Sequence, residues 1–368
     1  MLRAVARVDL GAITRNCAHL KATVGAATRL CAVVKADGYG HGAAEAARAA
    51  RRGGAEWLAV ATAGEARDLR AGGLDGPVLI MGALSEEEVP VAVAARADVV
   101  AWRAGFVAAL ARTEGAEGIG VHVKLDTGMG RLGTRDPGEA LTVAHAVAAD
   151  PRLRLAGAMT HFATADDPDP AFMHEQLRAF EPWAAAVREE FPEVLVHAAN
   201  SAAAIREPAA RFDLVRCGIA IYGMDPYGTD AAAVGLEPAL ELRSYVAEVK
   251  RARPGESAGY GRRFVASEPT WIGTLPIGYA DGVRRGLTND LDVVIAGRRH
   301  PLVGTVSMDN VTVDLGPDDA AAQALRGEPA VLLGQGVTAE DWARRLGTIN
   351  YEVTCGIGAR VPRDHVGA

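Results

Sequence analysis

The chain has 368 residues, of which 49% are hydrophobic and 23% are charged, a composition typical of a globular protein. It carries 39 lysines and arginines against 46 aspartates and glutamates, so its formal net charge is −7. Because this balance leaves no basic surplus to displace counterions from phosphates, we expect no nucleic-acid partner. At roughly 150 residues per domain the length suggests two domains, or a barrel of about 250 residues with a smaller partner.

The cysteines and the apolar runs bear on compartment and metal content. Four cysteines are widely spaced and form no Cys-x-x-Cys pair: Cys17, Cys31, Cys217 and Cys355. We therefore expect neither a disulfide framework nor a metal site. Asp9 interrupts the start of the chain before an apolar core of signal-peptide length builds up, and no 18 consecutive apolar residues occur. These patterns predict a cytoplasmic protein that does not enter a membrane.

Short apolar runs alternate with alanine-rich amphipathic stretches from about residue 30 to 235. The runs are rich in Val, Leu and Ile, as expected of buried parallel strands, and span 30–36, 57–62, 77–82, 97–102, 119–127, 153–162, 193–200 and 213–218. Between them lie helical segments such as 41–53 and 135–150, where Asp136 before Pro137 has the pattern of an N-cap. About eight strand–helix repeats predict an α/β fold, a (β/α)₈ TIM-type barrel over residues 1–235. A doubly wound open sheet is the alternative, but no Gly-x-Gly-x-x-Gly follows the first strand.

The pattern changes after about residue 236. Short strand-like runs are then joined by Gly, Pro and Asn-Asp turns, with few helical stretches between them. This part of the chain, residues 236–368, predicts a separate and mostly antiparallel β domain.

Polar residues at the carboxyl ends of barrel strands are candidates for the active site. The first strand ends in Lys35, where apolar surroundings would lower the pKa of the amine and make it a nucleophile for a Schiff base. A solvated lysine at a strand end fits the spacing equally well. The fifth strand delivers Lys124, Asp126 and Arg131, and an arginine after a glycine-rich turn suits the grip of a carboxylate.

The last three strands add groups of a second kind. The sixth ends in His161, the seventh in Asn200 and Ser201, and the eighth in Arg216 followed by Gly218 and Ile219. Ser201 and the backbone of residues 218–219 could cradle a phosphate, where barrel phosphate sites commonly form. Each of these residues alone would more often be structural. Together the strand ends suggest a cofactor with an aldehyde and a phosphate, pyridoxal 5'-phosphate (PLP), bound to Lys35.

Several sequence blocks resemble those of one enzyme family. AVVKADGYGHG, at residues 32–42, resembles the PLP-lysine segment of alanine racemases. Further blocks are similar to that family's in the same order: KLDTGMGRLG, MTHFATAD, HAANSAA, RCGIAIYG, GYGRRF, TLPIGYADG, SMDN and INYEVTCGIGARVPR. The resemblance covers essentially the whole chain, and it implies a barrel followed by a β domain that work as a head-to-tail homodimer.

The resemblance also implies roles for individual residues. Lys35 would hold PLP and act as the base on the D face, while Tyr260 of a second subunit would be the base on the opposite face. The implied cofactor contacts are Tyr39, His161, Asn200, Ser201, Arg216, Gly218, Ile219 and Tyr351, with Arg216 at the pyridine nitrogen. The implied substrate contacts are Arg131 and the backbone of Met308. The supporting residues would be Asp309, Tyr279 in the substrate channel, and Lys124, which matches a lysine that is carbamylated in many members.

The chain departs from the family's blocks at three positions. Gly259 stands where many members have serine, and Thr305 and Ser307 stand where an arginine and a cysteine are common. The expected function is alanine racemisation that supplies D-alanine for peptidoglycan, and a serine or broad-specificity racemase is the alternative because these positions lie near the substrate. A decarboxylase would place an acid where this chain has Arg216, and a PLP-carrier module would lack the second domain.

Overall fold

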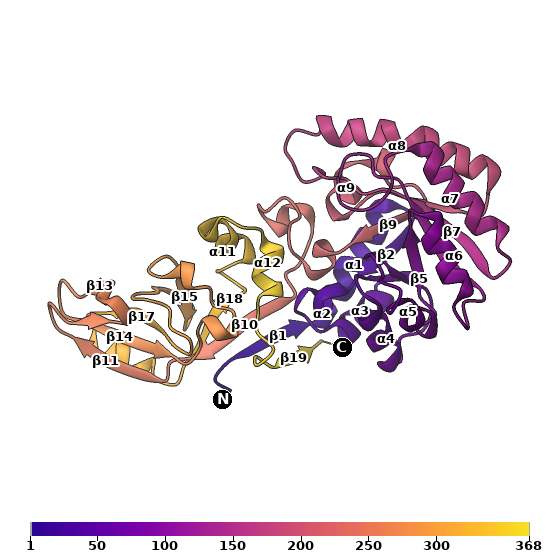
Figure 1. The fold of residues 1–368 in the computed structure, drawn as a ribbon. Helices are drawn as coiled ribbons and strands as arrows, with labels where there is room; N and C mark the ends of the chain where they lie inside the picture. The colour runs from indigo at the N-terminus through magenta and orange to yellow at the C-terminus, as the bar shows by residue number, and fades with distance from the viewer. Residues whose placement is uncertain (1, 368) are drawn as a thin grey trace. The chain divides into compact units, whose positions relative to one another are not determined.

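A computed structural model describes residues 2–367, and the chain forms two compact units (Figure 1). One unit is Ile13–Tyr227, and the other combines the segment that ends at Ala12 with the chain from Gly228 onward. The domains predicted from the sequence, residues 1–235 and 236–368, therefore differ from these units where the barrel unit begins and where it ends. The N-terminal segment belongs to the second unit because β1 (Val5–Asp9) pairs antiparallel with β10 (Leu240–Tyr245) and parallel with β19 (Arg363–Val366).

The first unit is the predicted (β/α)₈ barrel. Its eight parallel strands follow the order β8-β7-β6-β5-β4-β3-β2-β9. Between the two end strands the Asp213 N–H donates to the Val196 carbonyl at 3.0 Å, which brings the ends of the sheet together. Seven strands lie within the predicted runs, and β2 begins one residue before its run. The strands are β2 (Arg29–Val33), β3 (Trp57–Val60), β4 (Val78–Ile80), β5 (Asp98–Ala101), β6 (Ile119–Lys124), β7 (Leu153–Met159), β8 (Leu195–His197) and β9 (Leu214–Cys217).

Helices connect the barrel strands and cover the barrel, as Figure 1 shows. The predicted cap is confirmed: the Asp136 carboxylate accepts the N–H groups of Gly138 at 2.7 Å and Glu139 at 3.2 Å, and so satisfies backbone donors that begin α7. The helices are α1 (Leu10–Val24), α2 (Lys35–Tyr39), α3 (Ala43–Arg52), α4 (Ala63–Ala71), α5 (Val89–Ala94), α6 (Ala104–Arg112), α7 (Pro137–Ala149), α8 (Ala171–Glu190) and α9 (Ser201–Arg206). No helix within residues 2–367 has the length and apolarity needed to cross a bilayer.

The second unit is the predicted β domain. Its largest sheet has the order β16-β15-β18-β10-β1-β19, and only the β1–β19 pair of this sheet is parallel among the described residues. A three-stranded sheet, β11-β14-β17, and the small β12-β13 pair are antiparallel. The remaining strands are β11 (Glu248–Ala252), β12 (Ser257–Ala258), β13 (Phe264–Val265), β14 (Thr270–Leu275), β15 (Asp292–Ile295), β16 (Arg298–Pro301), β17 (Val311–Gly316) and β18 (Pro329–Leu333). Three helices complete the unit: α10 (Asp319–Ala324), α11 (Ala339–Leu346) and α12 (Asn350–Cys355).

Candidate active site

Lys35 begins a turn with an uncommon backbone. β2 ends two residues earlier, and the residues after the lysine take left-handed angles: Ala36 at φ 52° and ψ 51°, Asp37 at 51° and 48°, and Tyr39 at φ 53°. For residues other than glycine this conformation costs roughly 1–2 kcal/mol each, so it persists only where surrounding contacts impose it. The Lys35 turn is therefore held by the rest of the barrel.

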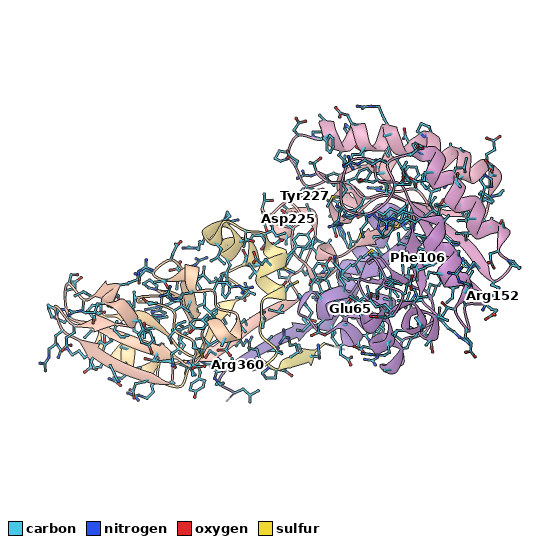
Figure 2. The ribbon with its side chains drawn as sticks, viewed as in Figure 1. Glu65, Phe106, Arg152, Asp225, Tyr227 and Arg360 are labelled. Atoms are coloured by element: carbon cyan, nitrogen blue, oxygen red, sulfur yellow. The ribbon has the colours of Figure 1, made fainter. Side chains whose placement is uncertain are left out.

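The contacts that hold the turn come from three side chains. The Glu65 carboxylate accepts the Ala36 N–H at 2.6 Å, and its other oxygen accepts the Ala61 N–H at 2.7 Å, which ties the turn to the end of β3 (Figure 2 labels Glu65). Asp37 Oδ1 accepts an N–H from the start of α3 at 2.9 Å. The His41 Nδ1–H donates to the carbonyls of Gly38 and Tyr39, both at 3.0 Å. The sequence analysis missed Glu65, although its spacing from Thr62 fits a capping box, which is what the structure shows at α4.

Three of the predicted phosphate ligands lie together beside this turn. Ser201 Oγ accepts the N–H groups of Gly218 at 3.0 Å and Ala220 at 3.4 Å, which leaves its own hydrogen available for a ligand. A Cβ placed on Gly218 would lie only 2.4 Å from the Tyr39 hydroxyl oxygen, so the absence of a side chain there keeps the space open. Asn200 adjoins this cradle, and its side-chain oxygen accepts the Ala203 N–H as the cap of α9.

Arg216 is buried at the end of β9 and meets His161. One Nη donates to His197 Nδ1 at 2.9 Å, and the other lies 3.1 Å from His161 Nδ1 and 2.9 Å from the carbonyls of Thr160 and Ala198. Burial lowers the pKa of Arg216 to about 10, so the guanidinium remains charged at neutral pH. Burial and then the Arg216 charge hold the pKa of His161 well below its usual range. No acceptor in the described chain, residues 2–367, is bonded to the Arg216 Nε–H, which leaves it available to a ligand.

A chain of buried polar side chains continues from Arg216 through the barrel. His197 Nε2 lies 2.8 Å from His122 Nδ1, and His122 Nε2 lies 3.4 Å from Asp98 Oδ2. Because a guanidinium only donates, His197 Nδ1 must accept, and each imidazole then donates from Nε2 toward the next group. We call this directional chain, Arg216–His197–His122–Asp98, the barrel relay.

Charge balances the barrel relay at its far end. The Asp98 carboxylate also accepts the Gly120 N–H at 3.2 Å and lies 3.0 Å from the half-exposed Arg154. Burial alone would raise the pKa of Asp98, but the hydrogen bond from His122 and the bond and charge of Arg154 lower it overall. Burial and the Arg216 charge hold the pKa of His197 well below its usual range. The sequence analysis missed this relay; polar residues inside three apolar strand runs were its only signal.

Lys124 and Arg131 flank the same end of the barrel. Lys124 is buried, and burial followed by the charges of Arg216 and Arg131 lowers its pKa to about 8, against the opposing effect of Asp126. The Asp126 carboxylate accepts the N–H groups of residues 128 and 130 at 3.1 and 3.0 Å, and this shapes the loop that leads to Arg131. The Arg131 side chain is exposed, where a small acid can reach it.

The other predicted site residues lie in the β unit: Tyr260, Tyr279, Met308, Asp309 and Tyr351. The first three are exposed, with 74% of Tyr260, 41% of Tyr279 and 52% of Met308 accessible. The Tyr279 N–H donates to the Ser307 carbonyl at 2.9 Å, which joins the turn of Tyr279 to the segment of Met308. Tyr351 lies on α12.

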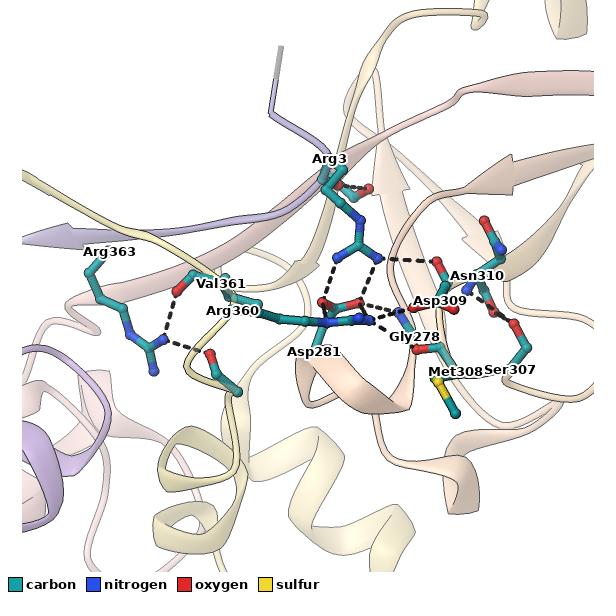
Figure 3. A network of polar contacts seen from close by, with 12 residues as sticks. Arg3, Gly278, Asp281, Ser307, Met308, Asp309, Asn310, Arg360, Val361 and Arg363 are labelled. Carbon is teal, nitrogen blue, oxygen red and sulfur yellow. Dashed lines mark hydrogen bonds and ion pairs between the residues drawn. The ribbon is translucent and has the colours of Figure 1, made fainter.

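Two arginines clamp this edge of the β unit around one carboxylate (Figure 3). Asp281 is buried, and its two carboxylate oxygens accept hydrogen bonds from the guanidinium of Arg3 at 2.7 and 3.0 Å. They also accept hydrogen bonds from the guanidinium of Arg360 at 2.7 and 3.1 Å. Burial alone would raise the pKa of Asp281, but the bonds from Arg3 and Arg360 lower it overall. Arg360 continues to Asp309 Oδ1 at 2.7 Å and to the Met308 carbonyl at 3.3 Å. The predicted residues Met308 and Asp309 therefore sit on a segment that is fixed by ion pairs.

The fold and site define an enzyme with its functional groups at the strand ends of a (β/α)₈ barrel, followed by a β domain. The sequence matches the description "Alanine racemase, N-terminal domain" over residues 8–226 and "Alanine racemase, C-terminal domain" over 239–365. The chain therefore belongs to the alanine racemase family, and it is a racemase, an enzyme of the isomerase class.

Individual relatives match over nearly the full length. The alanine racemase of Thermobifida fusca is 42% identical and that of Halalkalibacterium halodurans 39%, over 99% and 97% of this chain and 98% and 93% of theirs. Among solved structures, alanine racemase from Streptomyces coelicolor A3(2) superposes with a TM-score of 0.92 at 37% identity, covering 99% of this chain and 98% of that one. The structure from E. faecalis has a TM-score of 0.91 at 36% identity, with the same coverage of both chains.

Proposed function

We propose that this racemase interconverts L- and D-alanine with PLP as its cofactor, in the cytoplasm, and supplies D-alanine for peptidoglycan. The observation that carries the proposal is the cradle of Tyr39, Ser201 and Gly218 beside the Lys35 turn. The cradle offers a hydroxyl donor and open space where a Cβ would otherwise lie, and both suit a phosphate group. The Arg216 Nε–H, which the barrel relay does not use, suits a ring nitrogen that accepts a hydrogen bond. The residues present therefore fit PLP.

When bound through the Lys35 amine, PLP supplies an electron-withdrawing ring that lowers the barrier to removal of a substrate's α-proton. Arg216 tunes that ring through its charge. A guanidinium with a pKa of about 10 stays protonated and only donates, so it would donate to the ring nitrogen of bound PLP without giving up its proton. The barrel relay supports this state, because His197 accepts from Arg216 and so fixes the orientation of the guanidinium. We propose that this limits the electron withdrawal and suppresses side reactions such as transamination.

Racemisation requires a base on each face of the α-carbon. We propose Lys35 for the D face, since its place at the strand end already commits it to one side of the bound ring. We propose Tyr260 for the L face, because its hydroxyl can accept and return a proton. Arg131 would hold the substrate carboxylate by paired hydrogen bonds, with the backbone of Met308 opposite it.

We propose further that Tyr260 and Met308 act in the site of a second copy of the chain, in a head-to-tail homodimer. The exposure of Tyr260, Tyr279 and Met308 supports this, because large apolar side chains that gather at a surface commonly mark an interface. The buried clamp around Asp281 supports it too, since it fixes the segment of Met308 without help from substrate.

The test is an assay of the purified chain with PLP on each L-amino acid, read by chiral chromatography. We expect L-alanine to approach an equal mixture of enantiomers, and Lys35→Ala to lose the visible band of the bound cofactor together with activity. The alternative is a serine or broad-specificity racemase, because the resemblance places Thr305 and Ser307 near the substrate, where an arginine and a cysteine are common. Faster turnover of serine than of alanine would establish that alternative and overturn the proposed substrate.

A further inference from the structure

Tyr260 stands at the tip of a tight turn, and 74% of the residue is exposed within its own chain, so packing inside that chain does not fix the direction of its hydroxyl. The turn that carries it, residues 259–263, has left-handed backbone angles at Gly259 (φ 75°), Gly261 (φ 69°) and Arg262 (φ 50°). Within its own chain, contacts to the backbone of this turn therefore set the position from which the side chain projects.

One such contact is a buried hydroxyl. Thr305 is 5% exposed, and its Oγ1 donates to the Tyr260 carbonyl at 2.6 Å. The two backbones lie against each other at this point: a Cβ on Gly259 would be 2.9 Å from the Thr305 nitrogen. A Cβ on Gly304 would likewise be 2.5 Å from the Ala258 carbonyl oxygen. The two glycines thus allow the close approach that brings the hydroxyl onto the carbonyl.

A second contact holds the other end of the turn. The Asn289 side-chain nitrogen donates to the Arg263 carbonyl at 3.0 Å. The same amide's oxygen accepts the Gly304 N–H at 2.5 Å, so Asn289 is bonded to the residue that precedes Thr305. Asn289, Gly304 and Thr305, which we call the Tyr260 bracket, therefore hold the carbonyls of residues 260 and 263 from one connected support.

We propose that Thr305 and Asn289 are positioning residues that aim the Tyr260 hydroxyl at one face of the substrate. The inference rests on the proposed function, in which Tyr260 is the base for L-alanine. It also gives a role to Thr305, one of the positions at which the chain departs from the family's blocks. The bracket acts on the tyrosine's backbone alone, so its loss impairs one face of the reaction and leaves the other intact.

The test measures the two faces separately, as deuterium incorporated from D₂O into recovered alanine of unchanged hand. In Thr305→Val we expect exchange into L-alanine to fall about 3- to 10-fold, the factor one neutral hydrogen bond is worth. Exchange into D-alanine should stay within about twofold of the parent. Thr305→Ser keeps the hydroxyl and should restore L-alanine exchange. Thr270→Val is the matched control, because it removes a buried threonine bond, to the Asp314 carboxylate at 2.5 Å, in the same domain without touching the turn or the bracket.

A readout independent of activity is amide hydrogen exchange in residues 259–263, which should become faster in Thr305→Val and not in Thr270→Val. Asn289→Asp keeps the acceptor for Gly304 and loses the donor to Arg263, so it should show the same asymmetry and carries the test if Thr305→Val does not fold. Equal losses for both enantiomers, or undiminished L-alanine exchange, would overturn the inference. Tyr260→Phe separates the proposed role of Tyr260 as a base from the positioning role of the bracket. If Tyr260→Phe spares L-alanine exchange, the proposed function fails. If Tyr260→Phe abolishes L-alanine exchange and the bracket variants do not reduce it, only the bracket inference fails.

Discussion

Replacing Asp98 by asparagine tests the direction of the barrel relay with one atom changed. The Asp98 carboxylate only accepts hydrogen bonds, and its donors are His122 Nε2–H, the Gly120 N–H and the Arg154 guanidinium. An asparagine has one accepting oxygen and one donating nitrogen. If the nitrogen faces His122, both imidazoles must reverse their tautomers, and His197 then presents a hydrogen to Arg216. If the nitrogen faces the other way, it meets the Gly120 N–H.

Either orientation leaves one buried donor without an acceptor. A buried unsatisfied donor costs about 1–3 kcal/mol, and the figure is larger when a charged group such as Arg216 is involved. His122 and His197 are both fully buried, so water cannot relieve the mismatch easily. We therefore expect Asp98→Asn to lower the free energy of unfolding by about 2–3 kcal/mol.

Urea unfolding of the protein without cofactor measures this loss apart from catalysis. Arg154→Ala is the control, because it removes a partner of Asp98 whose side chain is 54% exposed. Because the Arg154 end of this ion pair is half exposed to solvent, the pair should contribute at most about 1 kcal/mol. An Asp98→Asn protein whose stability lies within about 0.5 kcal/mol of the parent, below the cost of any unsatisfied donor, would refute the directional relay.

Three further predictions follow from the same contacts. His197 is buried with a lowered pKa, so below pH about 6.5 the unfolded chain binds a proton that the native state does not. Stability should therefore decrease as the pH falls, by up to about 2 kcal/mol at pH 5 from this residue. His197→Gln should remove that part of the pH dependence in urea titrations. Gly218→Ala puts a Cβ against the Tyr39 hydroxyl and should weaken PLP binding at least tenfold in absorbance titrations, whereas Gly105→Ala, whose Cβ meets nothing within 4 Å, should leave it unchanged. Mixed chains of inactive Lys35→Ala and inactive Tyr260→Phe should recover about a quarter of the active sites after random exchange, and no recovery with exchange confirmed would contradict shared sites.

The features that the sequence predicted correctly are those set by local or repetitive patterns. The eight barrel strands are readable because strands buried on both faces form continuous apolar runs. The Asp136 cap is readable because both its partners lie within three residues. The boundary between the units was not readable from the sequence, because β1 is placed by pairing with strands more than 200 residues away.

The same distinction separates the site residues. Lys35, Ser201 and Arg216 follow apolar runs, and strand ends meet at one end of a barrel, so their proximity could be foreseen. The left-handed turn after Lys35 could not, because its strain is supported by Glu65 on α4, about 30 residues further along the chain. His122 is a polar residue inside a buried strand, and the sequence around it does not indicate that it joins His197 to Asp98.

The central claim is that Lys35 and Tyr260 serve opposite faces of the substrate, and the Tyr260→Phe variant tests it most directly. The substitution removes the ionisable oxygen and keeps the ring, so the protein should fold and bind PLP. Loss of one acid–base group typically costs about 10²–10⁴-fold in rate. In D₂O we expect this variant to incorporate deuterium into D-alanine close to the parent rate and to lose incorporation into L-alanine by that factor. Equal losses for both enantiomers, or unchanged exchange into L-alanine, would contradict the account.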